Sequence, residues 1–130
     1  MASELLDDLR AALEEASRTV RGQKAIHGHD EDFDLEIAGR GTFHVAIARG
    51  QMEIGEGPSS RRETLHYTLV QVDESTLRAI LSGAISPVEA MEQGRLFLRT
   101  RIYGGALITI LLRSAYDLAG EKTLLSCRTQ

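Results

Sequence analysis

Apolar residues recur every three or four positions over the first part of the chain, which predicts an amphipathic helix from Ser3 to Arg21. Ser3 suits the N-cap, and acidic residues in the next turn suit the positive end of the helix dipole. Gly22 predicts the end of this helix. The polar segment from Gly22 to Asp32 is expected to be a loop. The apolar stripe consists of Leu5, Leu9, Ala12, Leu13, Ala16 and Val20.

Farther along the chain, apolar and polar residues alternate as they do in β-strands. The alternation predicts strands at 33–37, 42–47, 52–54 and 65–70, and a fifth strand at 95–102. Glycine-containing turns at Gly39 to Gly41 and at Arg49-Gly50 are typical of hairpins, so the sheet is expected to be largely antiparallel.

Three helices are predicted in the second half of the chain. One begins at Asp73 and ends at Gly83, and a short one begins at Ser86-Pro87, a good pair for an N-cap and first turn. The last runs from about Gly105 to Leu118 and is apolar on nearly every side from Ala106 to Leu112. Because such a helix must be covered all round, it is expected to run through the core or to line a ligand-filled cavity.

Length and composition fit one soluble domain. A chain of 130 residues with 42% hydrophobic and 26% charged residues can bury a core without a disulfide or metal. Its single cysteine, Cys127, favours a reducing compartment. A net charge of −4 argues against a nucleic-acid partner.

The sequence predicts a cytoplasmic protein. Acidic residues interrupt the N-terminus, which therefore lacks the pattern of a signal peptide. The longest apolar stretch, Ile102 to Leu112, is too short to span a bilayer, which needs about 20 residues. At most a transient membrane contact is expected. Only Lys24 and Lys122 are lysines among many arginines, a composition that hints at a GC-rich bacterial source.

The segment from His27 to Asp32 contains residue types that bind metals, but no predicted element fixes their geometry, so a solvated loop is expected. His44 and His66 are expected on the polar faces of two strands. No catalytic triad, paired-carboxylate motif, phosphate loop or metal motif is present. The sequence therefore predicts no catalytic residue, no metal site and no cofactor.

Arginines gather on one face of the last strand, and two more lie in an earlier loop: Arg95, Arg99 and Arg101, with Arg61 and Arg62. Charged strand faces are usually solvated. The same residues could form a docking patch for an acidic partner or for anionic lipid headgroups. The sequence leaves both interpretations open.

The run from Leu77 to Leu96, LRAILSGAISPVEAMEQGRL, resembles the signature of sterol-carrier-protein domains. In that family a short helix ends at a Ser-Gly pair, a Pro-containing turn opens the next helix, and a Gly-basic-Leu step starts the last strand. The segment from Gly55 to Pro58 is also similar to the family pattern. The similarity covers about Phe33 to Ala119 of a single domain spanning 1–130, with residues 1–22 as an N-terminal helix and 120–130 as a tail.

The resemblance implies an α+β fold, in which helices cover one face of a five-stranded, mostly antiparallel sheet. It also implies an apolar tunnel between the two layers that accepts fatty acids, acyl-CoA, sterols or isoprenoids. Thr100 and Arg101 stand where the family usually has Gly and Asp, so the ligand is left open. The expected lining residues are Phe33, Phe43, Val45, Leu69, Met91, Tyr103, Leu107, Ile108, Leu111 and Leu112.

The function that this resemblance implies is to carry or present a hydrophobic small molecule. The alternatives are a small enzyme, or an accessory subunit that holds a biosynthetic enzyme to its lipid substrate. Two or more titratable side chains converging inside the cavity would favour chemistry, whereas an apolar wall would favour carriage. Either a monomer or a homodimer is compatible with the sequence.

Overall fold

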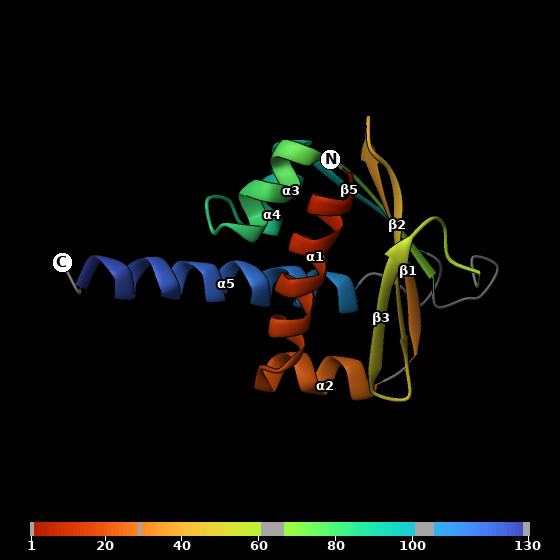
Figure 1. Cartoon of the computed structure of the whole chain (residues 1–130), viewed down its shortest axis with the longest axis horizontal. Helices are drawn as coiled ribbons and strands as arrows, with labels where there is room; N and C mark the ends of the chain where they lie inside the picture. The colour runs from red at the N-terminus through yellow and green to blue at the C-terminus, as the bar shows by residue number, and fades with distance from the viewer. Residues whose placement is uncertain (1, 29, 61–66, 101–105, 129–130) are drawn as a thin grey trace.

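A sheet and a set of helices form two layers, with the helices on one side of the sheet (Figure 1). The computed structural model describes residues 2–28, 30–60, 67–100 and 106–128. The elements are α1 (Ala2–Ser17), α2 (Val20–Gly28), β1 (Glu31–Ala38), β2 (Gly41–Ala48), β3 (Gln51–Glu56), β4 (Tyr67–Asp73), α3 (Glu74–Leu81), α4 (Pro87–Glu92), β5 (Leu96–Thr100) and α5 (Ala106–Arg128).

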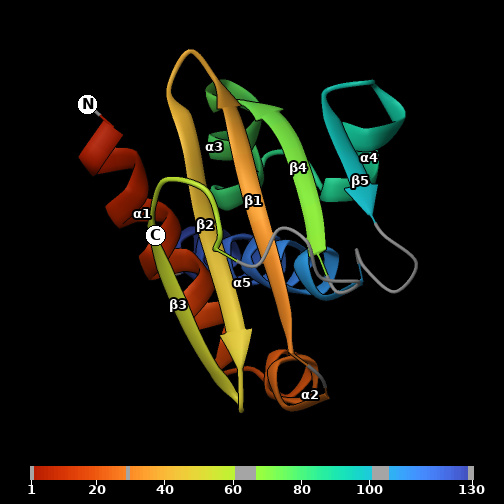
Figure 2. The same ribbon diagram turned by 90° about the vertical axis from the view of Figure 1, so that its right-hand side faces the viewer.

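The sheet has five strands in the order β3-β2-β1-β4-β5 (Figure 2). Its only parallel pair is β1 with β4, and the other neighbouring strands are antiparallel. Arg49 and Gly50 both have positive φ, 55° and 74°, which suits a tight hairpin turn between β2 and β3. The predicted α+β class and the mostly antiparallel sheet are therefore confirmed.

Alternate residues on the strands face the helices and build the core. Those on β1 and β2 are buried in two facing rows, because antiparallel pairing places Phe33 beside Val45 and Leu35 beside Phe43. Helices α1, α3 and α5 cover these rows with leucines and isoleucines. The main buried contributors from the helices are Leu5, Leu9, Leu13, Leu77, Ile80, Leu107, Ile108, Leu111 and Leu112.

The first helical segment is two helices, and the prediction that Gly22 ends it was wrong. Helix α1 ends at Ser17. Thr19 caps the start of the next helix, α2, because its Oγ1 accepts a hydrogen bond from Gly22 N at 3.0 Å. Gly22 then lies buried within α2. A Cβ at that position would lie 2.1 Å from the Ala16 carbonyl oxygen, so glycine permits the close approach of the two helices. The predicted loop at 22–32 is mostly helix.

The middle helices were predicted at the right places because their caps are local. Asp73 caps α3 by accepting from Thr76 N, and Ser86 and Glu89 form a reciprocal capping box on α4. Hydrogen bonds from the hydroxyls of Ser75 and Thr76 lower the pKa of Asp73 to about 2. This carboxylate is thus held ionised at the positive end of the helix.

Helix α5 is longer than its sequence pattern predicted. It continues past Leu118 to Arg128, and its C-terminal turns extend beyond the other helices (Figure 1). Apolar periodicity fades after Leu118, because this part of the helix does not cross the core. Within the described residues, no helix is both long and apolar enough to cross a membrane.

Candidate functional site

Most of the predicted lining residues meet in one apolar cluster between the sheet and α5. Phe33 and Val45, from β1 and β2, are fully buried, and Phe43 is 2% exposed. The residues on α5 that complete the set are 0–2% exposed: Leu107, Ile108, Leu111 and Leu112. All seven belong to the same hydrophobic core. The structure therefore brings together strand and helix residues that are more than sixty positions apart.

Of the other three predicted lining residues, one packs against the cluster, one faces away from it and one is outside the described residues. Met91 is half-buried on α4 and packs against the same cluster. Leu69 pairs with Asp34 across β1 and β4, and so lies on the outer face of the sheet, away from α5. The inward residues of β4 are Thr68, Val70 and Val72 instead. Tyr103 lies outside the described residues.

The apolar first half of α5 is covered from several directions. Four helices, α1 to α4, contact α5 as a whole, and the N-terminal end of α5 is the end that faces the sheet (Figures 1 and 2). Thr109 and Ile110 are half-buried, whereas the residues on either side of them are buried. This arrangement agrees with the expectation that the helix runs through the core.

Three buried carboxylates lie along β1, and the sequence pattern did not reveal them. Glu31 faces the helices and accepts a hydrogen bond from the Thr68 hydroxyl at 3.1 Å. Asp32 and Asp34 lie on the outer face, where the chain after β3 crosses them. The only signal in the sequence was the alternation of Asp32 and Asp34 on one side of a strand whose other side is apolar.

Ser59 and Tyr67 hold the outer carboxylates. Asp34 accepts from Ser59 N at 2.7 Å and from the Tyr67 hydroxyl at 2.6 Å, and Asp32 accepts from the Ser59 hydroxyl. A buried charge without such bonds would cost several kcal/mol. These carboxylates therefore hold residues 57–60, the described part of the chain after β3, against the sheet. Within the part of the chain that the structure describes, no group of histidines, cysteines and carboxylates could hold a metal ion.

The remaining polar candidates make local contacts. His44 Nδ1 lies 3.0 Å from the Gly57 carbonyl oxygen, and His27 Nδ1 lies 2.9 Å from that of Gln23. Arg95 donates to the Thr76 hydroxyl at 3.0 Å, and Arg99 is exposed. His66, Arg61, Arg62 and Arg101 lie outside the described residues. The structure therefore tests neither whether His44 and His66 lie close together nor whether the five arginines form one patch.

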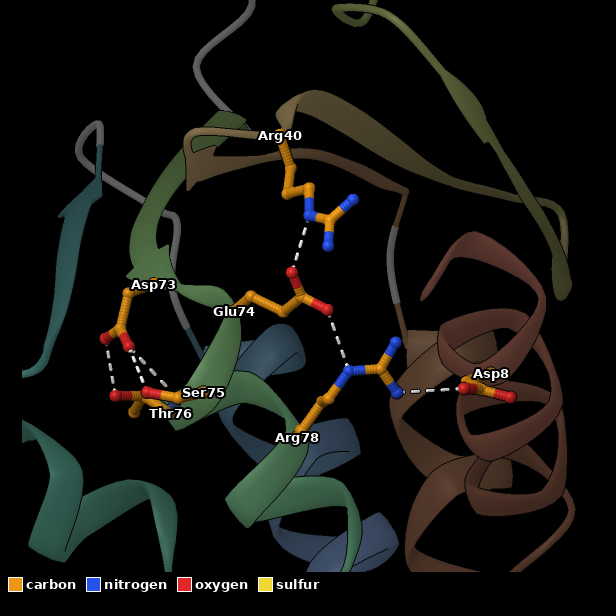
Figure 3. Close-up of polar contacts among 7 residues, drawn as sticks. All are labelled: Asp8, Arg40, Asp73, Glu74, Ser75, Thr76 and Arg78. Atoms are coloured by element: carbon orange, nitrogen blue, oxygen red, sulfur yellow. Dashed lines mark hydrogen bonds and ion pairs between the residues drawn. The ribbon is translucent and has the colours of Figure 1, made fainter. Parts of the chain in front are cut away.

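A chain of ion pairs joins the turn after β1 to α3 and α1 (Figure 3). Glu74 accepts from Arg40 at 2.5 Å and from Arg78 at 2.9 Å, and Arg78 also donates to Asp8 at 3.0 Å. The hydrogen bonds from Arg78 and Arg40 lower the pKa of Glu74, and those to Glu74 and Asp8 raise the pKa of Arg78. Arg78 is therefore held in place beside α1 by a partner on its own helix.

A groove with a volume of about 440 Å³ opens between α1, α3 and α5; we call it the α1–α3–α5 groove. Small and aliphatic side chains form most of its lining, and charged residues stand at its rim. The residues that line it are Asp8, Ala11, Ala12, Glu15, Arg78, Leu81, Ser82, Ala115, Leu118, Ala119 and Lys122. None of the predicted lining residues is among them.

Known proteins match this chain in structure and not in sequence. No protein-family model and no curated protein matches it. The UbiJ-SCP2 ubiquinone synthesis protein superposes on it with a TM-score of 0.59 and 14% identity, over 91% of this chain and 94% of that chain. The chain has the sterol-carrier-protein fold.

Other sterol-carrier-protein structures agree with this assignment. Sterol carrier protein 2 from Yarrowia lipolytica, in its apo form, matches with a TM-score of 0.52 and 16% identity, over 86% of this chain and 89% of that chain. A much larger enzyme, the sec-alkylsulfatase Pisa1 from Pseudomonas sp., matches with a TM-score of 0.55 and 15% identity, over 69% of this chain. This chain spans only 13% of that enzyme. At these identities the sterol-carrier-protein fold is shared, and function has to be argued from the site.

Proposed function

We propose that this chain binds a hydrophobic, lipid-like molecule in the apolar interior between the sheet and α5, and carries or presents it. The observation that carries the proposal is the apolar first half of α5, whose buried leucines and isoleucine share one core cluster with Phe33, Phe43 and Val45 of the sheet. A fatty acid, acyl-CoA, sterol or isoprenoid would suit such an interior. Transfer of an alkyl chain from water into it would contribute about 25 cal/mol per Å² of buried apolar surface.

The proposed wall is formed by the residues that the fold brings together: Phe33, Phe43, Val45, Met91, Leu107, Ile108, Leu111 and Leu112. Their side chains pack against one another in the present structure, so the ligand would separate the sheet from α5 as it binds. A polar group of the ligand would remain at the surface. The proposed ligand site is non-catalytic, because Glu31 is the one buried carboxylate among the described residues on the inner face of the sheet.

Titration with a fluorescent fatty acid tests the proposal. The native chain is expected to bind it saturably, and Ile108→Trp is expected to abolish binding because the indole fills the space that the alkyl chain would occupy. The matched control is Val20→Trp on α2, since Val20 is 77% exposed and far from the proposed wall. The control should bind like the native chain.

A melting curve of each variant separates loss of a site from loss of the fold. Overpacking a rigid core typically costs about 1–3 kcal/mol, whereas a separable interior would accept the larger side chain at lower cost. Native mass spectrometry of the purified chain, followed by extraction of any co-purified lipid, gives an answer that needs no variant. Absence of saturable binding by both the native chain and Val20→Trp would contradict the proposal.

A second candidate is an accessory role, in which the chain presents its ligand to a biosynthetic enzyme. It is supported by the match to the UbiJ-SCP2 ubiquinone synthesis protein, which covers 94% of that chain. The C-terminal turns of α5 project from the other helices and could contact such an enzyme (Figure 1). An extracted lipid of isoprenoid type would support this role, and a fatty acid alone would favour simple carriage.

A further inference from the structure

The floor of the α1–α3–α5 groove is shared with the hydrophobic core. Ala115 belongs to the core cluster, and Ala12 and Leu81 pack against it, yet all three also line the groove. Ala115 follows Leu111 by one helical turn on the same side of α5. One layer of side chains, two of them alanines, therefore separates the groove from the proposed ligand site.

Two ion pairs cross the groove and hold α1 to its neighbours. Lys122 on α5 lies 2.8 Å from Glu15, and Arg78 on α3 lies 3.0 Å from Asp8. Between these pairs α1 and α5 present alanines, which are too short to fill the space between the helices. All four charged side chains are at least 39% exposed, so water and salt screen both pairs. At the rim of the groove, α1 is therefore held to α5 by one exposed ion pair and to α3 by another, and both are sensitive to salt.

Other approaches to the interior are less suited to an alkyl chain. The edge of the sheet at β3 is closed by α1, where Arg10 donates to the Ile54 carbonyl oxygen at 2.8 Å. A hollow beside β5 is lined by Glu36, Asp73 and Arg95 among others. Another, beside α2, is lined by Arg21, Asp117 and Glu121 with three further residues. The hollow beside β5 lies against outer-face residues of the sheet, away from α5, and none of the residues that line the hollow beside α2 belongs to the core cluster.

We propose that the α1–α3–α5 groove is the entrance through which an alkyl chain reaches the interior. This inference rests on the proposed function and names the route by which the ligand enters. The groove volume of about 440 Å³ lies within the range of small-molecule sites, and its floor is aliphatic. Breaking the pairs Glu15–Lys122 and Asp8–Arg78 frees the rim of α1 from α5 and from α3 respectively, and re-forming them retains the bound ligand.

Stopped-flow mixing with a fluorescent fatty acid tests the entrance. Ala11→Trp places a bulky side chain in the groove, and the control Ala84→Trp places one at an exposed position in the turn between α3 and α4. An entrance controls rates and not affinity, so Ala11→Trp should slow uptake and release by about tenfold or more while Kd changes by less than about twofold. Equal rates in Ala11→Trp and Ala84→Trp would overturn the proposal.

Charge variants test the ion pairs without filling the groove. Lys122→Glu and Glu15→Lys should each speed uptake and release, by up to about fivefold for a pair contributing about 1 kcal/mol. The double variant Glu15→Lys with Lys122→Glu should restore the native rates, and added salt should speed uptake by the native chain but not by the single variants. Unchanged rates in every charge variant, with binding intact, would overturn the entrance alone. Failure of the native chain to bind the fatty acid would overturn the proposed function itself.

Discussion

Individual polar residues hold the described chain after β3, residues 57–60, against the outer face of the sheet. Asp34 is fully buried on a face that alternation alone would leave to solvent. Its burial depends on Ser59, which lies 25 positions along the chain, and on the Tyr67 hydroxyl. No local pattern encodes these contacts, so the sequence predicted the side of the strand correctly but not the burial of its carboxylates.

Tyr67→Phe is expected to destabilise the chain by about 1.5–3 kcal/mol, the usual contribution of a hydrogen bond to a charged group. The variant keeps the ring and removes the donor at 2.6 Å from the buried Asp34 carboxylate. The control is Tyr116→Phe on α5, because Tyr116 is half-buried and contacts the Arg113 guanidinium through its ring, which phenylalanine keeps. Urea unfolding of both variants checks the prediction. Equal losses in the free energy of unfolding would mean that the hydrogen bond from the Tyr67 hydroxyl to Asp34 does not stabilise the chain.

At the scale of elements, the junction between α1 and α2 depends on one glycine. A glycine within a helix usually lowers its stability relative to alanine by about 1 kcal/mol. Gly22 is retained in α2 although it has no cap function there, because the two helices approach too closely for a side chain. The close approach of α1 and α2 therefore explains the glycine at position 22, and the usual tendency of glycine to end a helix does not.

Gly22→Ala is therefore expected to destabilise the chain despite its better helix propensity, by about 1–3 kcal/mol as in other overpacked sites. Gly28→Ala is the matched control in the same helix. Its Cβ would meet nothing within 4 Å, so it should stabilise the chain by about 0.4–1 kcal/mol. Thermal melting measures both changes. A gain in stability from Gly22→Ala would show that α1 and α2 can move apart without cost.

Helices whose caps lie within three residues were predictable from the sequence. The ends of the first and last helical segments were not. The caps at Asp73 and Ser86 use residues within three positions, so α3 and α4 appear where the sequence placed them. Burial of the inward residues on β1 and β2 also follows from periodicity, and their role in lining a ligand site stays a prediction. Leu69 was assigned to the wrong face, since the register of β4 is set by its pairing with β1. The α1–α3–α5 groove joins helices that are far apart in the sequence, and no spacing pattern revealed it.

At the scale of the molecule, two layers meet across side chains that are 0–2% exposed on α5 and on the facing strands. A ligand between them has to replace contacts that the layers now make with each other. The outer face is fixed by buried carboxylates, whereas exposed ion pairs link α1 to α5 and to α3 at the rim of the α1–α3–α5 groove. Ligand binding should therefore be coupled to movement of the helices, while the sheet stays as it is.

Because the ligand is proposed to bind inside the folded chain and not to the unfolded one, it should raise the melting temperature. At a free concentration about 100 times Kd, the stabilisation is about 2.7 kcal/mol. For a domain of this size that amounts to a rise of about 10 °C. Scanning calorimetry of the native chain and of Ile108→Trp, each with and without fatty acid, measures the effect. Only the native chain should respond, because the substituted side chain fills the interior. A similar rise in both would place the ligand on the surface, since a surface site does not compete with the indole of Ile108→Trp for the same space.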